Sequence, residues 1–567
     1  MTSALRFVLA IGLMFLVLVG TNLLFPPIVP ESTIVPDSSA VPAVGTPAGA
    51  PGFQGSVPSV PTGAGPPTAQ IAPQPEAPAE RSVVVESPLY RFEFSSFGAR
   101  LVSAELPLFQ SLRHDGVVDL VPEGSDGFFG QRVVVGNDTI DLRRAPYRIE
   151  PESGLRLTAG GGAEVLRFIH ERPEGGPRLE MTYTFEPDAY SVRVEGQLAG
   201  VDRPLLLTDM GDGLAFAEAD SSTEARLMAF AYNHLDQGIT SETTLRAQPG
   251  VIEGPLLWAA FRSKFFVTVM LAGGSDETTT GTDYLGGLLV GPSGLPERVA
   301  IDAAQSIGND GRFAYRLFVG PQEYGTLSSL GQDLEEVNPY GWRFFRPIIR
   351  PFVSIIITIL NFLHTNLSIG YGWVLVVFGI AMRIVLFPLN HKAMKSQMKN
   401  MEFQPRLAEA QRKYKDNPEK MQQEVKKLYA EGFNPLAGCL PLLLPWPVLI
   451  ALFFVFQNTI EFRGVPFLWL PDLSTKDPFY VLPMLLAASM FLMQWLSLKS
   501  VEQPNPQMKI MMWMMPPMML LIFLNLASGL NLYYVVSNIA TIPQQMWISN
   551  ERKKMKARPA TQSAKGG

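Results

Sequence analysis

The 567-residue chain contains little cysteine, histidine or charge, and each shortage excludes a class of protein. Cys439 is the only cysteine, which excludes an intrachain disulfide and a cysteine-based zinc site. The five histidines do not cluster at metal-ligand spacing, and no H-E-x-x-H, G-x-S-x-G or G-x-x-x-x-G-K-[ST] motif occurs. The sequence therefore predicts no catalytic residue, no metal, no cofactor and no enzymatic activity.

Lysine is nearly absent from the first two thirds of the chain, where Lys264 is the only one before Lys392. Residues 82–340 carry 20 Lys and Arg against 37 Asp and Glu, a net charge of −17. Residues 341–567 carry 24 against 11, a net charge of +13. We expect the basic half to lie near anionic phospholipids and the acidic half away from them, with no specific nucleic-acid site. This division of charge predicts that the two parts of the chain lie in different compartments.

Charged residues make up only 17% of the chain, and a mean hydropathy of +0.14 indicates that part of it lies in a membrane. Phe7–Phe25 is long enough to cross a bilayer, either as a retained anchor or as a cleaved signal peptide. We favour an anchor at 1–25, because the run exceeds the usual signal-peptide core of about 7–15 residues. Residues 26–81, rich in Pro, Ala and Gly, predict a disordered tether.

Residues 82–338 predict an all-β sandwich domain. Leu179–Phe185 and Tyr190–Val194 alternate apolar and polar residues across a short polar turn, a pattern typical of a hairpin with one buried face. Pro321–Val337 predicts a short helix that leads towards the membrane. Further strands are expected at Tyr90–Phe94, Arg132–Val135 and Leu205–Thr208.

The remaining chain predicts an α-helical polytopic membrane protein. Residues 339–364 mix arginines and aromatics on an apolar segment, which predicts an interfacial amphipathic helix. Residues 365–550 predict a core of five transmembrane helices, and the anchor makes six. The five expected spans are Ser368–Leu389, Cys439–Asn458, Phe479–Leu498, Lys509–Ala527 and Leu530–Ile548.

The basic segments set the expected orientation. Residues 390–434 carry ten Lys and Arg, and the tail 551–567 carries six, so both are expected in the cytoplasm. With six spans the N-terminus is then also cytoplasmic, and the large acidic domain is periplasmic. This arrangement predicts a multi-pass protein of the bacterial cell inner membrane.

Arg383 is the one clearly intramembrane charge of the five expected spans. If its span starts near Ser368, it lies roughly 22 Å into a core of about 30 Å. An arginine at mid-bilayer costs about 2.5–3.5 kcal/mol on the lenient insertion scale. Two interpretations remain open: the side chain reaches nearby headgroups, or it occupies a water-filled recess that attracts acidic segments.

The same spans contain no Asp or Glu, which weakens a proton- or sodium-coupled carrier, because such carriers usually need an intramembrane carboxylate. Asn531 and Asn538 are seven residues apart with Tyr534 between them, so they share a helix face. That face either forms interhelical hydrogen bonds or lines a hydrated groove. The methionines of Met508–Met519 suit either ordinary packing or contact with variable apolar partners.

The cytoplasmic segment 390–434 predicts a helical hairpin. Asp416-Asn417-Pro418 is a turn signal between two runs with helical apolar spacing. The hairpin is either a solvated basic surface or a docking arm for peptides, the ribosome or anionic lipid. The apolar residues of the two runs are Met394, Met398 and Met401, then Met421, Val425 and Leu428.

Several stretches together resemble the YidC-type membrane protein insertases of the YidC/Oxa/Alb family, from Tyr340 to about Asn550. The acidic domain, with Phe97-Gly98-Ala99, resembles the Gram-negative form with its large periplasmic domain. The matching stretches are Tyr340-Gly341-Trp342, Ala381–Leu389, Asn434–Pro441, Ser528-Gly529-Leu530 and Tyr533–Asn538.

The resemblance implies a hydrophilic groove closed to the periplasm but open to the cytoplasm and lipid, with Arg383 as the groove arginine. Because Asn531, Tyr534 and Asn538 share a helix face, we predict them as further groove residues. It implies a cytoplasmic hairpin that captures substrate early. One departure is Gly379, where the family often has a polar residue. The substrate-contacting slide that the resemblance implies includes Pro441, Leu444, Pro447, Leu452, Met511, Met515 and Met518.

We therefore expect an insertase and folding chaperone for nascent membrane proteins, acting alone or with the Sec translocase and the ribosome. The alternatives are a solute transporter or channel with a ligand-binding periplasmic domain, and a structural scaffold for secretion. Reconstitution separates them, because an insertase integrates a small membrane protein into liposomes without solute flux.

Overall fold

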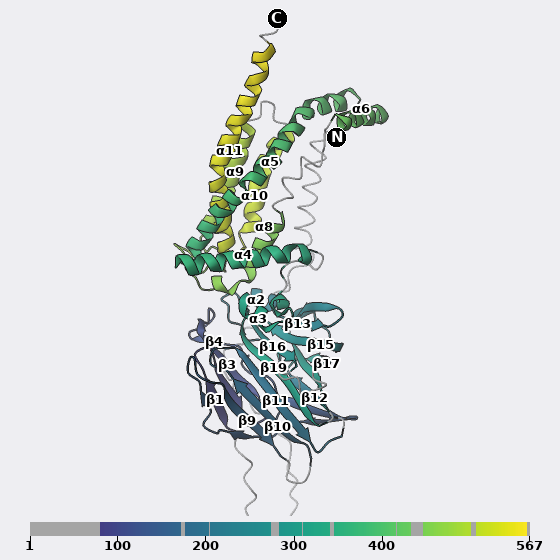
Figure 1. Ribbon diagram of the computed structural model, residues 1–567, viewed down its shortest axis with the longest axis vertical. Helices are drawn as coiled ribbons and strands as arrows, with labels where there is room; N and C mark the ends of the chain where they lie inside the picture. The colour runs from purple at the N-terminus through teal and green to yellow at the C-terminus, as the bar shows by residue number, and fades with distance from the viewer. Residues whose placement is uncertain are drawn as a thin grey trace, which may run out of the picture.

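The computed structural model describes residues 80–171, 176–202, 204–273, 283–296, 298–308, 310–338, 340, 345–414, 417–431, 446–499 and 506–563. A β domain and a helical domain lie end to end along the long axis of the molecule (Figure 1). The expected anchor 1–25 and residues 26–79 of the tether lie outside the described residues. The prediction of a β-rich segment followed by a helical region is confirmed.

The smaller sheet is formed from the start of the β domain. Its strands are β1 (Ser82–Glu86), β2 (Arg91–Ser95), β3 (Leu101–Gln110), β4 (Val117–Asp119) and β8 (Leu155–Arg156). They pair in the order β4-β3-β2-β1-β8, and β1 and β8 are parallel.

The larger sheet has fourteen strands among the described residues. They are β5 (Gln131–Val135), β6 (Asp138–Asp141), β7 (Arg148–Glu150), β9 (Glu164–His170), β10 (Arg178–Phe185), β11 (Ser191–Ala199), β12 (Leu205–Asp209), β13 (Ala229–His234), β14 (Gly238–Thr243), β15 (Gly250–Arg262), β16 (Phe266–Ala272), β17 (Leu285–Pro292), β18 (Val299–Ser306) and β19 (Arg312–Pro321). Twelve follow the order β6-β5-β12-β18-β17-β15-β16-β19-β11-β10-β9-β7, and β13 pairs with β14 and β15.

The expected hairpin is confirmed as β10 and β11, which pair antiparallel from Phe185 opposite Val192. Its alternation places one apolar face in the core. Phe94 of the smaller sheet packs 5.6 Å from Phe168 and 5.5 Å from Tyr183 of the larger one, measured between ring centroids. The two sheets therefore pack face to face through aromatic side chains.

Short helices lie near one end of the sandwich: α2 (Ser221–Leu227), η1 (Thr244–Arg246), α3 (Tyr324–Leu330) and η2 (Leu334–Val337). The single helix expected over Pro321–Val337 is instead α3 followed by η2, and Pro321 ends β19. Gly331 ends α3 with φ of +79°, a conformation that glycine adopts without a Cβ clash and that stops the helix.

The helical domain contains α4 (Arg346–Leu367), α5 (Tyr371–Lys413), α6 (Pro418–Ala430), α8 (Trp446–Asn458), η3 (Ile460–Phe462), α9 (Val481–Lys499), α10 (Pro506–Phe523) and α11 (Ser528–Ser563). By length and apolar composition, two described segments could cross a membrane, Arg346–Leu367 and Tyr371–Pro388. Three apolar helices are shorter, so the count of six spans stays a prediction.

Helix α4 runs crosswise to α5 and α11, between the helical bundle and the β domain (Figure 1). It packs along α8, and its buried side includes Ile349, Val353 and Ile356. Ile355 and Phe362 are exposed on its other side. The direction of α4 therefore differs from that of the longer helices, although its composition would also suit a span.

A buried carboxylate, Glu224 of α2, lies at the end of the β domain that faces the helices. Its side chain is 1% exposed, and its Oε2 accepts hydrogen bonds from the Ala217 and Glu218 amides at 3.0 Å. Burial, helped by the nearby Glu218 charge, raises the pKa of the Glu224 carboxyl to about 7. Because the folded state holds this proton more tightly than the unfolded chain, stability falls as pH rises from about 4.5 to 7.

We expect the wild type to lose about 2.5 kcal/mol of unfolding free energy relative to Glu224→Gln between pH 5 and pH 8. Glutamine keeps the carbonyl acceptor and does not titrate. Denaturant unfolding of the full chain in detergent, followed by the circular dichroism of the β-sheets, measures the difference. A difference that does not change with pH would contradict this account.

Candidate functional site

The candidate site is centred on Arg383, on the apolar part of α5. Arg383 follows the first residue of α5, Tyr371, by about 18 Å of helix and lies five residues before Pro388. Its side chain is partly buried. It points to α11, where its Nε donates a hydrogen bond of 2.7 Å to Ser537 Oγ. The structure thus joins the predicted groove arginine to α11 through a neutral hydroxyl group.

No described Asp or Glu forms an ion pair with Arg383. The polar groups around it are the Ser537 hydroxyl and the phenols of Tyr533 and Tyr534, which interact with its charge. Tyr533 and Ser537 are four residues apart, so both side chains lie on the face of α11 that meets α5. The guanidinium therefore keeps its full positive charge beside uncharged groups.

Tyr534, Asn531 and Asn538 occupy different positions on α11. Tyr534 is partly buried near Arg383, and its ring meets Phe523 edge to face at 5.1 Å. Asn531 is fully buried and donates from Nδ2 to the Phe523 carbonyl of α10 at 3.1 Å. Asn538 donates to Ser489 Oγ of α9, also at 3.1 Å.

These two asparagines therefore form interhelical hydrogen bonds. Their seven-residue spacing keeps both on one side of α11, which bonds to α9 through Ser489 and to the last residue of α10, Phe523. Of the four predicted groove residues, the structure brings Arg383 and Tyr534 together. Sequence reasoning did not select Tyr533 and Ser537, although their spacing of four on a helix, within a matched stretch, is a signal that could have found them.

Gly379, one turn before Arg383, allows α5 to approach α11 closely. A Cβ atom on Gly379 would lie 3.2 Å from Val536 Cγ1 and 3.6 Å from the Tyr533 carbonyl oxygen. A larger side chain would separate the two helices at the level of the Arg383–Ser537 hydrogen bond. The departure at Gly379 thus has a packing reason in this chain.

The predicted slide residues fall on α8 and α10 or outside the described residues. Pro441 and Leu444 lie outside them, and Pro447 is half-buried in the first turn of α8. Leu452 is fully buried in the helical core. Met511, Met515 and Met518 lie on α10; the latter two are half-buried, and the position of the Met511 side chain is not described.

The predicted capture hairpin is formed by the end of α5 and by α6. Met394, Met398 and Met401 lie on α5, but their side chains are outside the description. Met421 and Val425 are half-buried on α6, whereas Leu428 is buried. Arg406, inside α5, pairs with Glu431, just after α6, so the end of α6 is held against α5.

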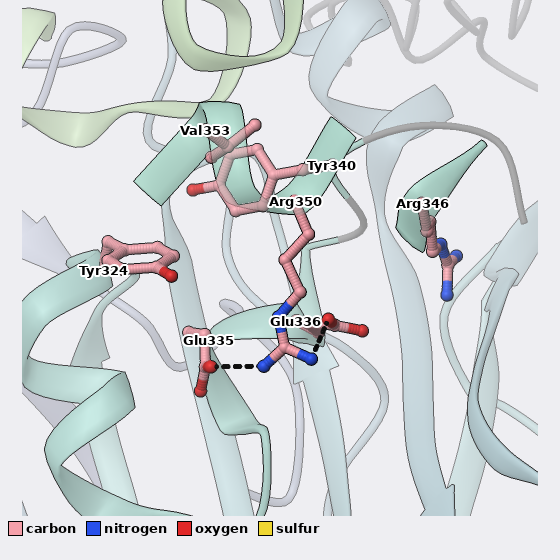
Figure 2. Close-up of a pocket in the computed structure, with 7 residues that line it drawn as sticks. All are labelled: Tyr324, Glu335, Glu336, Tyr340, Arg346, Arg350 and Val353. Atoms are coloured by element: carbon pink, nitrogen blue, oxygen red, sulfur yellow. Dashed lines mark hydrogen bonds and ion pairs between the residues drawn. The ribbon is translucent and has the colours of Figure 1, made fainter. Parts of the chain in front are cut away.

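We searched the described residues for a metal site and for a cavity that could hold a ligand. No group of three or more His, Cys, Asp or Glu in these residues could hold a metal ion. One cavity, between α4 and η2, has room for about one water molecule (Figure 2). Its lining residues are Tyr324, Glu335, Glu336, Tyr340, Arg346, Arg350 and Val353.

Comparison with known proteins now decides the family. The family model "60Kd inner membrane protein" matches residues 362–556, and "YidC periplasmic domain" matches residues 82–355. The membrane protein insertase YidC of Chlorobaculum tepidum is 33% identical over 86% of this chain and 87% of its own length. That of Chlorobaculum parvum is 32% identical over 83% and 82%. The chain belongs to the YidC family of membrane protein insertases.

A crystal structure titled as an active YidC insertase with its first transmembrane domain resolved covers 82% of this chain and 92% of its own, at 17% identity and a TM-score of 0.31. That likeness supports no further argument. Membership of the YidC family confirms the predicted family and an insertase, as opposed to an enzyme.

Replacing Gly379 with leucine should separate α5 from α11. Overpacking of this kind typically costs about 1–3 kcal/mol, so the melting temperature of the full chain in detergent should fall. Ile380→Leu is the matched control, because residue 380 is exposed on α5 and already carries a side chain of this volume. Equal melting temperatures for the two variants would show that the helices are not closely packed at Gly379.

Proposed function

We propose that this YidC-family protein inserts nascent proteins into the bacterial inner membrane through a hydrophilic groove around Arg383. The substrate's polar segment contacts the guanidinium on its way across the membrane. Partition of the substrate's apolar helix into lipid then drives the step. Because a polar recess shortens the apolar distance to be crossed, the barrier for a hydrophilic segment falls.

The observation that carries this proposal is the neutral surroundings of Arg383. A partly buried guanidinium beside Ser537 and two tyrosines keeps its attraction for an acidic segment, because no described carboxylate neutralises it. An arginine already paired with a carboxylate would attract a passing acidic segment much more weakly, because its charge would be neutralised. The side chain therefore suits a transient electrostatic contact.

The orientation that we propose places the β domain in the periplasm and both termini in the cytoplasm. The α5–α6 hairpin and the end of α11 extend from the bundle at the end opposite the β domain (Figure 1). Both of these segments are basic. Basic segments favour the cytoplasmic side. Six spans, with α4 in the outer interface, complete this arrangement.

The basic hairpin supports the proposed partners, namely nascent membrane proteins, the ribosome and anionic phospholipids. Its Lys and Arg residues suit anionic surfaces, and its methionines suit apolar segments of varied sequence. Association with the Sec translocase is proposed from family resemblance. These contacts would bring a substrate to the cytoplasmic end of α5 before it meets Arg383.

The groove proposal is tested by reconstituting Arg383→Lys, Arg383→Ala and Arg383→Glu in liposomes with a small nascent membrane protein. Lysine should keep most of the insertion rate, because it keeps the charge. Alanine should lose about tenfold, equivalent to about 1.4 kcal/mol of stabilisation, and glutamate at least as much. The insertion rate is measured by protease protection of the substrate.

Arg178→Ala is the control for this series, because Arg178 forms exposed ion pairs within the β domain. It should insert substrate at the wild-type rate. Equal rates for wild type and all three Arg383 variants would reject the electrostatic role. Solute flux through liposomes that contain the wild-type protein would instead favour a channel.

A further inference from the structure

The loop from α8 to α9, residues 459–480, contacts both domains. Its first residues include η3, of which two side chains pack into different domains. Ile460 belongs to the hydrophobic core of the β domain, whereas Phe462 belongs to that of the helical domain. Phe462 packs 5.3 Å from Phe456 of α8 and 5.5 Å from Tyr371 of α5, between ring centroids. The end of α8 is therefore fixed between both cores.

Arg463 follows η3 directly and points into the β domain. Its Nε lies 2.6 Å from Glu218 Oε1, and its two terminal nitrogens donate to the carbonyls of Gln110 at 2.9 Å and Ala217 at 3.2 Å. Its guanidinium also lies over the Phe266 ring, 5.2 Å from the centroid. The Arg463 and Glu218 side chains are only 4% and 7% exposed.

The β domain holds the acceptors for Arg463 in place from its own side. Glu224 of α2 binds the backbone amides of Ala217 and Glu218, the residues that supply a carbonyl and a carboxylate to Arg463. Lys264 adds a second contact with the loop, because its Nζ donates to the Ser474 carbonyl at 3.1 Å. The receiving surface is therefore organised to accept a guanidinium.

A second arginine, Arg350 of α4, also contacts the β domain. It reaches to η2 and pairs with Glu335 and Glu336 at 2.9 Å (Figure 2). It also pairs with Asp333 at 2.8 Å. Its side chain is 44% exposed, however, against 4% for Arg463. Since exposed ion pairs contribute little and truncated buried ones cost much, Arg463 is the main ionic contact between the domains.

We propose that Arg463 is a positioning residue for insertion: it holds the end of α8 against the β domain. This inference rests on the proposed function and on the prediction that α8 contacts the substrate through the slide residue Pro447, in the first turn of the helix. Arg463 follows the last residue of α8, Asn458, by five residues, so releasing it frees that end of the helix. A freed α8 would present a variable surface to the substrate, and insertion would slow without any loss of charge near Arg383.

The physical part of the test is a distance between the domains. Spin labels are attached to cysteines at Leu108 of the β domain and Leu468 of the loop, both exposed, in a Cys439→Ser background. The full chain is measured in lipid nanodiscs by pulsed electron paramagnetic resonance. The wild-type contact should give a narrow distance distribution, and Arg463→Met should broaden it. Arg178→Met, which removes an arginine from exposed pairs, should leave it narrow.

The functional part is the insertion rate of the same variants, without labels, in proteoliposomes. Arg463→Met should lose insertion several-fold, and Glu218→Gln should lose less, because it keeps a hydrogen-bond acceptor. Arg463→Met alone leaves Glu218 as an unpaired buried charge, whereas the double variant Arg463→Met/Glu218→Met removes both charges of the pair, so it should recover part of the melting temperature that the single variant loses. Its insertion should stay low, because methionines supply no directional bonds. If Arg463→Met does not fold, the insertion rates and the distance distributions of Glu218→Gln and of the double variant test the positioning role instead.

A narrow distance distribution in Arg463→Met would overturn the inference, and so would a double variant that recovers insertion together with its melting temperature. Arg383→Ala in the same proteoliposomes separates the two proposals. If Arg383→Ala inserts normally, the proposed groove function fails, whatever the effect of Arg463. If Arg383→Ala is impaired while an Arg463→Met protein with a broadened distance inserts normally, only the positioning role fails.

Discussion

The positive charge of Arg383 lies between two apolar helices, without a carboxylate partner among the described residues. Such a charge costs about 2.5–3.5 kcal/mol at mid-bilayer even on the lenient scale, and a neutral hydroxyl returns only part of that. The cost is tolerated most readily where water reaches the guanidinium. The close approach of α5 and α11 at Gly379 fixes the side chain beside Ser537.

Ion pairs and hydrogen bonds join the β domain to the helical domain that contains this site. The two domains carry opposite net charge, and at their junction arginines of the helical domain bind carboxylates of the β domain. The loop 459–480 also receives the start of α11, because the Ser528 and Gly529 amides donate to the Thr475 and Leu473 carbonyls. One loop therefore holds α8, α11 and the β domain together.

Much of the fold could be predicted from local patterns. The period-two alternation of Leu179–Phe185 determined the hairpin, because one buried face fixes its register. The apolar segment Tyr371–Pro388 lies within three residues of the predicted span Ser368–Leu389 at both ends, but the helix itself continues to Lys413, because the polar residues after Pro388 are also compatible with a helix. The sheet order could not be predicted, because pairings such as β12 with β18 join residues about a hundred positions apart.

The candidate site, too, could be predicted only where a single segment carries the signal. Arg383 stands out in any single span, because a charge among apolar residues is costly. The sequence shows that Asn531 and Asn538 are polar, but not whether they line a groove or bond to another helix. Their role depends on which helices lie next to them, and that is known only from the fold. Arg463 carried no signal at all, because its partner Glu218 is 245 residues away in the sequence.

The hydration of the Arg383 surroundings is the most direct test of the account. In a Cys439→Ser background, a cysteine in place of Tyr534 lies beside Arg383, whereas one in place of Ile384 lies on the exposed side of α5, one residue further along. Thiols react with a membrane-impermeant maleimide only where water reaches them. The account predicts rapid labelling at position 534 from the cytoplasmic side and slow labelling at position 384. Equally slow labelling at both positions would show a dry guanidinium and contradict the groove.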